Sequence, residues 1–338
     1  MTRVSVVVLA YGDEPHLHGC VESLLSSTAV DVDVVLVDNG CSQQAVVEEL
    51  AARDRVTLVR PTSNLGYAGG CNAGAAQAEG DVIAFVNSDA IAEPGAVAAL
   101  AAAVRDESVG LATGSVRLAD EPDLINAAGN PLNILGVAWA GHFREPAVEH
   151  DQPRPVTLVS GAAFACRRST WLTLGGFDAA YFAYHEDTEL SVRCWQRGLS
   201  VCYAPDAVVR HYYEFSRNPR KLMLLERNRL LNLLVLWQSR TLLLLLPALV
   251  SFELAMLGLA AKQGWLGQKL TGYGWLWQHR DHVRSRRALV QRERVVPDRE
   301  LARLLTPSIT AANFELPAAI RAVNAVLAAY WSVVRRLL

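Results

Sequence analysis

The sequence predicts an α/β fold with a mostly parallel, doubly wound sheet. Apolar runs rich in β-branched residues recur along the first part of the chain, at Val4–Leu9, Val34–Val37, Val56–Val59 and Val82–Val86. Segments of helical character such as His16–Ser26 and Gln43–Arg53 follow these runs. Alternating strands and helices are typical of a parallel sheet, and near-continuous apolarity fits strands that helices cover on both faces. A ligand site is then expected at the carboxyl ends of the strands.

The segment from Gly110 to about Asp151 breaks this pattern. Prolines interrupt it repeatedly, at Pro122, Pro131, Pro146, Pro153 and Pro155. We therefore expect irregular loops here that cover the site and select one of its substrates.

Composition bounds the class of protein. A chain of 338 residues has room for one large α/β domain and an extension, which we place at 1–220 and 221–338. A net charge of −2 argues against nucleic-acid binding, because phosphate contacts need a basic face. The six cysteines form no CxxC pair and are expected to be buried free thiols in a reducing compartment. The apolar run after Arg3 is too short for a signal peptide.

Hydrophobic residues, 51% of the chain, concentrate after Arg229. The run Thr241–Ala261 carries one formal charge, Glu253, and is just long enough to span a bilayer core of about 30 Å. It can span the membrane, form a buried hairpin or lie in the interface as a helix pair. We favour the interface, because Pro247 splits the run and a carboxylate is costly at mid-membrane.

A basic stretch follows this apolar run. It contains acids, Asp281 and Glu293, and three tryptophans stand near it. Its arginines are Arg280, Arg284, Arg286, Arg287, Arg292 and Arg294. Arginines beside aromatic anchors suit an anionic membrane leaflet. The alternative is a solvated helix with internal ion pairs.

Polar residues follow the predicted strands. Asp38, in Asp38-Asn39-Gly40, can accept a hydrogen bond from a base or ribose, although the same tripeptide also makes a plain turn. The glycines of Asn64–Gly74 permit close approach of the backbone to a ligand before a helix begins. Asn87 and Asp89 are two positions apart on extended backbone and point the same way, so they can hold a divalent cation; the alternative is a turn or helix cap.

Two further clusters stand late in the chain. Glu186, Asp187 and Glu189 open a predicted helix behind Gly175–Asp178 and can supply a general base, or merely complement the helix dipole. His211 ends a strand-like run and is a competent metal ligand, although a lone histidine is more often an ordinary polar residue.

Taken in order, these motifs resemble glycosyltransferase family 2, from Val4 to about Leu231. Within that family the chain is most similar to the bacterial branch of rhamnosyltransferases and galactofuranosyltransferase-like enzymes. In that branch Asn-x-Asp replaces Asp-x-Asp, as in Asn87–Asp89, and an Arg-Asn-Arg stretch, here Arg227–Arg229, follows the histidine. The resemblance implies a GT-A fold and an inverting, metal-dependent transfer from a nucleotide sugar.

The resemblance also implies roles for individual residues. Asp187, with Glu186 beside it, is the expected catalytic base, while Asp89 and His211 bind Mg²⁺ or Mn²⁺. Asp38 contacts the nucleotide base. The expected nucleotide-sugar contacts are Ala10, Tyr11, Asp38, Asn39, Asn64, Gly66, Gly70, Asn72, Asn87 and Ser88. The expected acceptor or phosphate contacts are Gly161, Trp195, Arg217 and Arg220.

The resemblance makes dTDP-rhamnose the leading donor and UDP-galactofuranose its alternative. The expected acceptor is a hydroxyl of a cell-envelope glycan or of a polyprenyl-diphosphate-linked sugar. A peripheral or monotopic enzyme that can oligomerise would meet it at the cytoplasmic face of the plasma membrane. A non-catalytic, membrane-associated nucleotide-binding protein stays open. An NAD-linked oxidoreductase is disfavoured, because the loop Ala10–Pro15 lacks GxGxxG.

Overall fold

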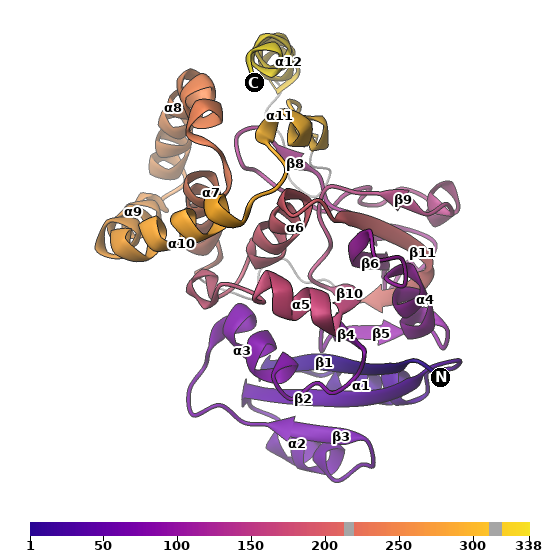
Figure 1. Cartoon of the computed structure of the whole chain (residues 1–338). Coiled ribbons are helices and arrows are strands. Elements are labelled where there is room, and N and C mark those ends of the chain that lie inside the picture. The colour runs from indigo at the N-terminus through magenta and orange to yellow at the C-terminus, as the bar shows by residue number, and fades with distance from the viewer. Residues whose placement is uncertain (213–219, 311–319) are drawn as a thin grey trace.

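A mixed sheet of ten strands forms the centre of the molecule (Figure 1). The computed structural model describes residues 1–212, 220–310 and 320–338. Eight strands follow one another across the sheet in the order β3-β2-β1-β4-β10-β6-β11-β5, with β7 paired to β6 and β9 to β11. The expected α/β class is confirmed. Parallel pairing joins β1 to β2 and β4, β2 to β3, and β6 to β11, whereas β10 and β5 run antiparallel to their neighbours.

The ten strands are β1 (Arg3–Gly12), β2 (Asp31–Cys41), β3 (Val56–Val59), β4 (Val82–Val86), β5 (Ala90–Ala92), β6 (Val109–Leu118), β7 (Ile125–Ala127), β9 (Arg154–Pro155), β10 (Ala163–Arg167) and β11 (Ser200–His211). The helices of this part are α1 (Leu17–Leu25), α2 (Gln44–Ala51), α3 (Gly66–Ala75), α4 (Ala96–Ala103), α5 (Arg168–Leu174) and α6 (Glu186–Gln196). The four predicted strands and the helices between them are therefore present.

Helices cover both faces of the sheet, because alternate side chains of each buried strand point to opposite faces. Val6 and Val8 of β1 belong to an apolar cluster with residues of α1, α2 and α4, including Leu24 and Leu100. Val7 belongs to a second cluster with residues of α3, α5 and α6. This double cover explains why the strands read as continuous apolar runs.

Strand β6 is the main departure from the sequence prediction, which placed loops from Gly110 onward. It pairs with both β10 and β11 at the centre of the sheet. The glycines and hydroxyl residues of β6 interrupt the apolar run that would have predicted a strand. Close packing of β6 against its neighbours explains two of them, Gly114 and Thr113. A Cβ on Gly114 would stand 2.5 Å from the carbonyl oxygen of Ala207, and the Thr113 hydroxyl donates to the Ala163 carbonyl at 3.1 Å. Irregular loops begin only after Leu118 and contain β8 (Leu132–Asn133) and the 3-10 turn η1 (Ala147–His150).

The glycines of Asn64–Gly74 also differ from expectation. All four lie within α3, and two of them, Gly70 and Gly74, face the sheet. A Cβ on Gly70 would stand 2.2 Å from Leu9 Cδ1, and one on Gly74 would stand 2.6 Å from Val7 Cγ1. Gly70 and Gly74 therefore bring a helix close to β1, which is a packing role. The nucleotide-sugar contacts expected of Gly66 and Gly70 stay predictions.

The C-terminal part is helical and includes α7 (Lys221–Leu236), α8 (Ser239–Lys262), α9 (Leu266–Gln278), α10 (Arg280–Glu293), α11 (Asp298–Leu301) and α12 (Ile320–Leu337). A short strand, β12 (Leu305–Thr306), pairs with β8, and two further 3-10 turns are η2 (Ala179–Tyr181) and η3 (Ala302–Leu304). One apolar cluster contains both Val7 of β1 and Val334 of α12. The division at residue 220 stays a prediction.

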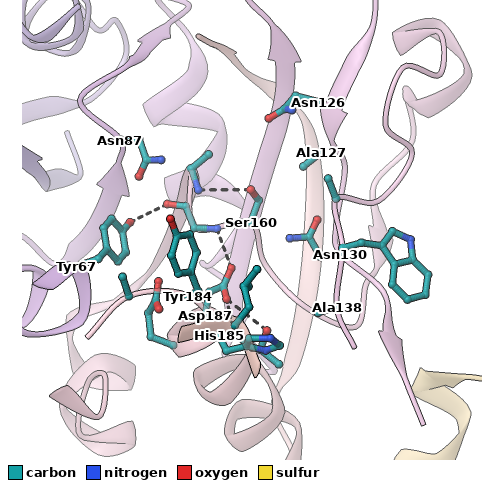
Figure 2. A pocket seen from close by; sticks show the side chains of 18 of the residues that line it. Tyr67, Asn87, Asn126, Ala127, Asn130, Ala138, Ser160, Tyr184, His185 and Asp187 are labelled. Carbon is teal, nitrogen blue, oxygen red and sulfur yellow. Dashed lines mark hydrogen bonds between the residues drawn. The ribbon is translucent and has the colours of Figure 1, made fainter. Parts of the chain in front are cut away.

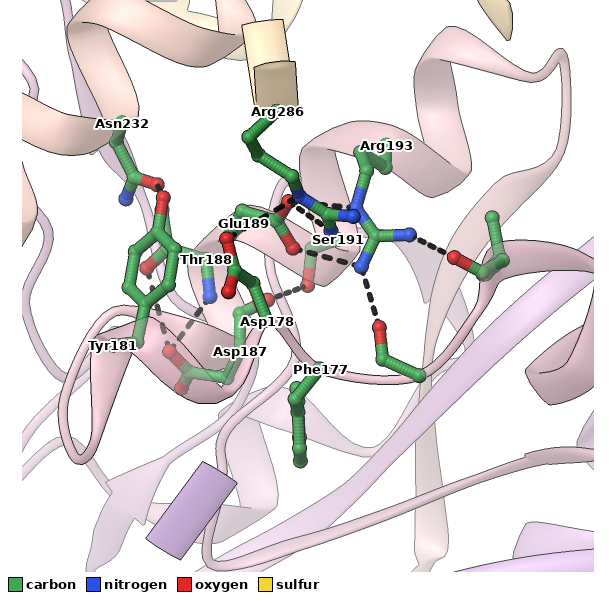
Figure 3. A network of polar contacts seen from close by, with 12 residues as sticks. Phe177, Asp178, Tyr181, Asp187, Thr188, Glu189, Ser191, Arg193, Asn232 and Arg286 are labelled. Carbon is green, nitrogen blue, oxygen red and sulfur yellow. Dashed lines mark hydrogen bonds and ion pairs between the residues drawn. The ribbon is translucent and has the colours of Figure 1, made fainter. Parts of the chain in front are cut away.

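Three of the arginines expected at a membrane face the protein instead. Arg286 of α10 pairs with Glu189 at 2.7 Å and with Asp178 at 3.4 Å, so it ties α10 to α6 (Figure 3). Arg287 donates to the carbonyl oxygens of Leu234 and Trp237. Arg294 pairs with Asp298. These three arginines point inward for the same chemical reason. A guanidinium donates hydrogen bonds to buried carboxylates and to the free carbonyls at a helix end. The remaining three, Arg280, Arg284 and Arg292, are exposed.

Helix α8 projects from the body and is barely covered. Of the helices in the described residues, α8 is the one that is long and apolar enough to cross a membrane. Only 6% of its most apolar stretch is buried inside the protein. This exposure excludes the alternative in which Thr241–Ala261 is a hairpin buried within a single copy of the chain. Glu253 points back to the protein, where it pairs with Arg229 at 2.5 Å and Lys269 at 2.6 Å. Its charge is therefore neutralised within the fold.

Candidate active site

A cavity of about 410 Å³ lies at the edge of the sheet where β4 and β11 end (Figure 2). Seven segments line it: Tyr67 of α3, Asn87 after β4, β7 with the loop up to residue 140, the turn 160–162 before β10, residues 183–188 at the start of α6, His211 at the end of β11, and the start of α7. The site expected at the carboxyl ends of the strands is therefore present as a cavity.

Asp89 and His211 lie side by side, although 122 positions separate them in the chain. The antiparallel pairing of β5 and β11 sets His211 opposite Ala90, and the Tyr212 amide donates to the Asp89 carbonyl at 2.9 Å. His211 Nε2 is 3.1 Å from Asp89 Oδ1, and both side chains are nearly buried. The structure thus brings the two predicted metal ligands together.

Asn126 orients the His211 ring, a role with no signal in the sequence. Its Oδ1 lies 3.0 Å from His211 Nδ1, at the far side of the ring from Asp89. An amide oxygen accepts a hydrogen bond, so this contact favours the tautomer that carries its proton on Nδ1. Nε2 then directs its lone pair toward Asp89, and a carboxylate facing a lone pair needs a cation or a proton between them.

The donor set therefore fits a divalent metal. Histidine with a carboxylate suits Mn²⁺ or Mg²⁺, and the carbonyl-type oxygen of Asn87 is a further oxygen donor near the same strand end. Asn87 Oδ1 is buried and has no hydrogen-bond partner among the described residues. An orphaned buried acceptor is costly, so it indicates a missing positive or donor group.

Asp187 also lines the cavity, at the start of α6 (Figure 2). Its Oδ2 accepts from the Gly161 amide at 3.2 Å and its Oδ1 from the Thr188 amide at 2.7 Å. Gly161, expected to contact an acceptor or phosphate, lines the cavity and holds this carboxylate. Burial raises the pKa of Asp187, and the two amide contacts oppose that shift. A carboxylate of raised pKa is a stronger base.

Glu186 is buried beside Asp187. Burial, together with the charge of Asp187, raises the pKa of Glu186 to about 8. Its Oε2 has no partner among the described residues. We therefore expect Glu186 to be protonated at neutral pH, so Asp187 carries the negative charge of the pair.

The backbone before these acids is strained. Phe182, Tyr184 and His185 all have positive φ, at 63°, 69° and 67°. Non-glycine residues adopt this conformation at a cost of about 1–3 kcal/mol each, and such residues cluster at functional sites. Asn228 stabilises the turn by donating to the carbonyls of Tyr181, Ala183 and Tyr184. The Arg-Asn-Arg stretch thus supports the loop that presents Asp187.

Sequence reasoning missed several residues of the cavity wall. Lys221 begins α7 and lies over the Tyr184 ring at 5.5 Å, and burial lowers the pKa of its amine to about 8. Trp139 lies in the loop that we expected to cover the site. The Tyr67 hydroxyl donates to the Gly161 carbonyl at 2.8 Å. These residues come from segments distant in sequence, so spacing carried no signal for them.

Several predicted donor contacts are already engaged within the protein. Asp38 accepts from the amides of Gly40 and Cys41 and from the side chains of Gln44 and Arg60. Although burial acts to raise it, these donors hold the pKa of Asp38 below its usual range. A base contact by Asp38 therefore requires it to exchange a partner.

Asn39, Asn64 and Gly66 form one network at the end of β2. Asn39 Nδ2 donates to Asn64 Oδ1 at 2.9 Å, and the Gly66 amide donates to the same oxygen at 2.8 Å. Asn72 exchanges two hydrogen bonds with the backbone of Phe177, at 2.8 and 3.0 Å. These amides fix loops around the site. Ala10 and Ser88 are buried and Tyr11 is exposed, and nucleotide contacts by this set stay predictions.

Two predicted acceptor or phosphate contacts lie away from the cavity. Trp195 is buried on α6, and its indole donates to the Thr157 carbonyl at 3.1 Å. Its position on α6 faces the core rather than the opening of the cavity, so its contact with an acceptor or phosphate stays a prediction without support from the geometry. Arg220 is exposed just before α7. Arg217 lies outside the described residues.

The sheet and its edge cavity have the architecture of the GT-A glycosyltransferases. The fold superposes on GalNAc-T7, solved with UDP, GalNAc and Mn²⁺, with a TM-score of 0.59 and 17% identity over 71% of this chain and 49% of that one. It also superposes on the mannosyltransferase PcManGT of Pyrobaculum calidifontis, solved with GDP-Man and Mn²⁺, with a TM-score of 0.51 and 16% identity over 99% of this chain and 86% of that one.

The chain belongs to the family described as glycosyltransferase like family 2, whose model matches residues 2–230. It is 31% identical over 233 residues to the N-acetylglucosaminyl-diphospho-decaprenol L-rhamnosyltransferase of Mycobacterium tuberculosis, covering 61% of this chain and 75% of that protein. A probable N-acetylgalactosaminyltransferase 9 of Caenorhabditis elegans is 26% identical over 54% of this chain and 34% of its own length. The family assignment made from the motifs is confirmed.

Proposed function

We propose that this glycosyltransferase is metal-dependent and inverting, and that it moves a sugar from a nucleotide diphosphate to an acceptor hydroxyl. One observation carries the proposal: a half-buried carboxylate, Asp187, lines the same cavity as His211, and His211 Nε2 lies 3.1 Å from Asp89 Oδ1. A sugar diphosphate between them presents its anomeric carbon to Asp187 and its phosphates to the Asp89–His211 pair.

Asp187 is the proposed base. Its carboxylate removes the proton of the acceptor hydroxyl, whose oxygen attacks the anomeric carbon from the face opposite the departing diphosphate. The transition state resembles an oxocarbenium ion, and a single displacement inverts the configuration at that carbon. The amides of Gly161 and Thr188 hold the carboxylate in place during this step.

The proposed phosphate side of the site would become cationic when a metal is bound. Asp89 and His211, with Asn87 nearby, would hold Mg²⁺ or Mn²⁺, which supplies neutralisation of the charge that develops on the diphosphate. Lys221 lies on the same cavity and adds a positive group from α7. Arg220 and Arg217, just before α7, are proposed to assist.

The proposed donor is dTDP-rhamnose, with UDP-galactofuranose as the alternative of the same reaction type. The mycobacterial relative, named for L-rhamnosyl transfer to a decaprenyl-diphosphate-linked sugar, supports the first. We propose an acceptor of the same kind, a cell-envelope glycan or a polyprenyl-diphosphate-linked sugar, and assign its selection to the loop that carries Asn130 and Trp139.

A lipid-linked acceptor places the enzyme at a membrane surface. The uncovered apolar side of α8 supports a peripheral or monotopic attachment at the cytoplasmic face of the plasma membrane. Residues of α8 also offer a surface through which copies of the chain can oligomerise.

The decisive experiment compares Asp187→Asn with the wild-type chain. We expect the variant to bind donor and Mn²⁺ as the wild type does in a thermal-shift panel of nucleotide sugars, because the amide keeps the shape of the carboxylate. Transfer should fall by about 10²–10⁴-fold, since the base is lost. Normal transfer by the variant would remove Asp187 from this role.

Asp54→Asn, an exposed change just after α2, is the matched control and should keep full transfer. If the wild-type chain binds nucleotide sugars but transfers none to lipid-linked or glycan acceptors, the chain is instead a non-catalytic, membrane-associated nucleotide-binding protein.

A further inference from the structure

Two histidines and a glutamate converge on the loop between β7 and β9, outside the cavity described above. His142 Nδ1 is 2.9 Å from Glu145 Oε2, and His150 Nε2 is 2.8 Å from the same oxygen. The two imidazole rings lie 4.2 Å apart, centroid to centroid. One donor atom from each residue lies within 4.8 Å of the other two. The geometry points to a transition-metal site, and we propose that this triad binds Zn²⁺ or a similar ion.

The chemistry of the triad supports a metal of this class. Two imidazoles and one carboxylate are a known donor set for Zn²⁺, which leaves a fourth position for water. Donor atoms around a tetrahedral ion with bonds of about 2.0–2.1 Å stand roughly 3.3 Å apart. The two contacts to Glu145 Oε2 need to open by only about half an ångström. Glu145 is half-exposed, so its side chain has room for this movement.

The backbone positions all three ligands before any ion arrives. The Tyr203 hydroxyl, from the core of β11, donates to the His150 carbonyl at 3.0 Å. The Ile125 amide donates to the Glu145 carbonyl at 2.9 Å, and the Glu145 amide donates to the His142 carbonyl at 3.0 Å. His142 has a φ of 62°, a left-handed conformation that these contacts maintain. A site whose ligands are held in place loses little entropy on binding.

The ion has a defined place relative to the cavity. Glu145 pairs through its backbone with Ile125, the residue before Asn126, and the same loop carries Trp139 of the cavity wall. Metal binding at the triad therefore fixes the loop that forms one side of the cavity. This inference does not depend on the reaction proposed above, because it concerns a separate set of ligands.

The test uses the full chain stripped with chelator, with Zn²⁺ alone as the probe. In an Asp89→Ala background, which removes a ligand of the other metal site, calorimetry should detect one Zn²⁺ per chain with micromolar or tighter affinity. The melting temperature should rise by roughly 2–5 °C at saturating Zn²⁺. Circular dichroism confirms that each variant is folded.

Adding His142→Ala or His150→Ala to that background should abolish both signals, whereas Glu121→Gln should keep them. Glu121 is the matched control, because it is a half-exposed carboxylate that pairs with Arg144 of the same loop at 2.8 Å but lies outside the triad. Absence of Zn²⁺ binding in the Asp89→Ala chain, or binding that survives both histidine changes, overturns the proposal. A wild-type chain that transfers no sugar would contradict the proposed function but would not affect the Zn²⁺ proposal. The two proposals can therefore fail separately.

Discussion

The His211 imidazole illustrates how much of this site depends on single contacts. A histidine becomes a metal ligand only when its second nitrogen is fixed, and outer partners of this kind typically change metal affinity by 10–100-fold. Asn126 provides that contact at 3.0 Å from Nδ1. The ligand role proposed for His211 therefore depends on a residue of a different strand.

Asn126→Ala should weaken metal binding without removing a ligand. We expect the Mn²⁺ concentration that supports half-maximal transfer to rise by about 10–100-fold, because the imidazole loses its fixed tautomer. Asn126→Asp keeps an acceptor opposite Nδ1 and should restore the wild-type requirement. Titration of transfer against Mn²⁺ measures both, and an unchanged requirement in Asn126→Ala would contradict the role.

The raised pKa of Glu186 also affects the stability of the fold. Its pKa is about 8 in the folded chain and about 4.5 when exposed, so folding takes up a proton between these values. This contribution to stability is complete below pH 4.5 and is lost as pH rises through 8. Glu186→Gln should remove this contribution. The unfolding free energy of the variant should then fall less steeply with rising pH, by up to about 1.4 kcal/mol per pH unit.

Urea titrations at pH 5.5, 6.5 and 7.5 measure this slope. Glu107→Gln, on the exposed turn before β6, is the control and should keep the wild-type dependence. Parallel behaviour of the wild type and Glu186→Gln across this range would show that Glu186 is already ionised in the folded chain.

At the scale of elements, α3 shows a motif whose residues were recognised but whose purpose was misjudged. Glycines before a helix are typical of ligand loops. Here the helix has already begun at Gly66, and its glycines meet Leu9, Val7 and Val37 of the sheet. The residue type is compatible with both roles, and only the packing partner distinguishes them.

Gly74→Ala should therefore destabilise the fold. Its added methyl group would meet Val7 Cγ1 at 2.6 Å and Val37 Cγ2 at 2.8 Å, and overpacking of this kind costs about 1–3 kcal/mol. Gly274→Ala in α9 is the matched control, since a Cβ there meets nothing within 4 Å. It should be neutral or stabilising by up to about 1 kcal/mol. Urea unfolding compares the two, and equal stability of both variants would contradict the packing argument.

Helix α10 makes the same point for charge. A run of arginines in sequence does not show which side chains meet solvent. In the fold, Arg286 reaches Glu189, a fully buried acid that also pairs with Arg193 at 2.7 Å (Figure 3). The ion pairs considered as an alternative are present for four of the six arginines, Arg284, Arg286, Arg292 and Arg294. The three exposed arginines can still meet an anionic surface.

At the scale of the whole molecule, the surface of helix α8 is apolar, in contrast to the surface of the domain that contains the cavity. The apolar side chains of α8 are uncovered, with Leu243 70% and Leu254 64% exposed. These two residues are 11 positions apart, or about three turns, and so lie on one face. A contiguous apolar face of this size indicates a lipid or protein partner.

The variant Leu243→Glu with Leu254→Glu tests the membrane assignment. We expect binding to vesicles that contain anionic phospholipid to weaken at least tenfold in sedimentation, while the fold is kept, because charge is costly in the lipid interface. Leu172→Glu, on α5 and 65% exposed, is the control and should bind as the wild type does. A full-length chain that ignores vesicles altogether would exclude attachment through α8.

The sequence alone determined the alternation of strands and helices, the family, and the choice of Asp89, Asp187 and His211 as candidate site residues. These features depend on local patterns, since an apolar run or a polar residue at a strand end keeps its meaning wherever the strand is placed. Position in the chain was enough to anticipate that the carboxyl ends of the strands would meet.

Only the tertiary structure decided what each polar or small residue touches. Strand β6, the sheet-facing glycines of α3, the inward arginines of α10, Asn126 and the His142–Glu145–His150 triad all depend on partners far away in sequence. Close packing, hydrogen-bond satisfaction and charge pairing are properties of neighbours in space, and a linear pattern contains no record of which segments become neighbours.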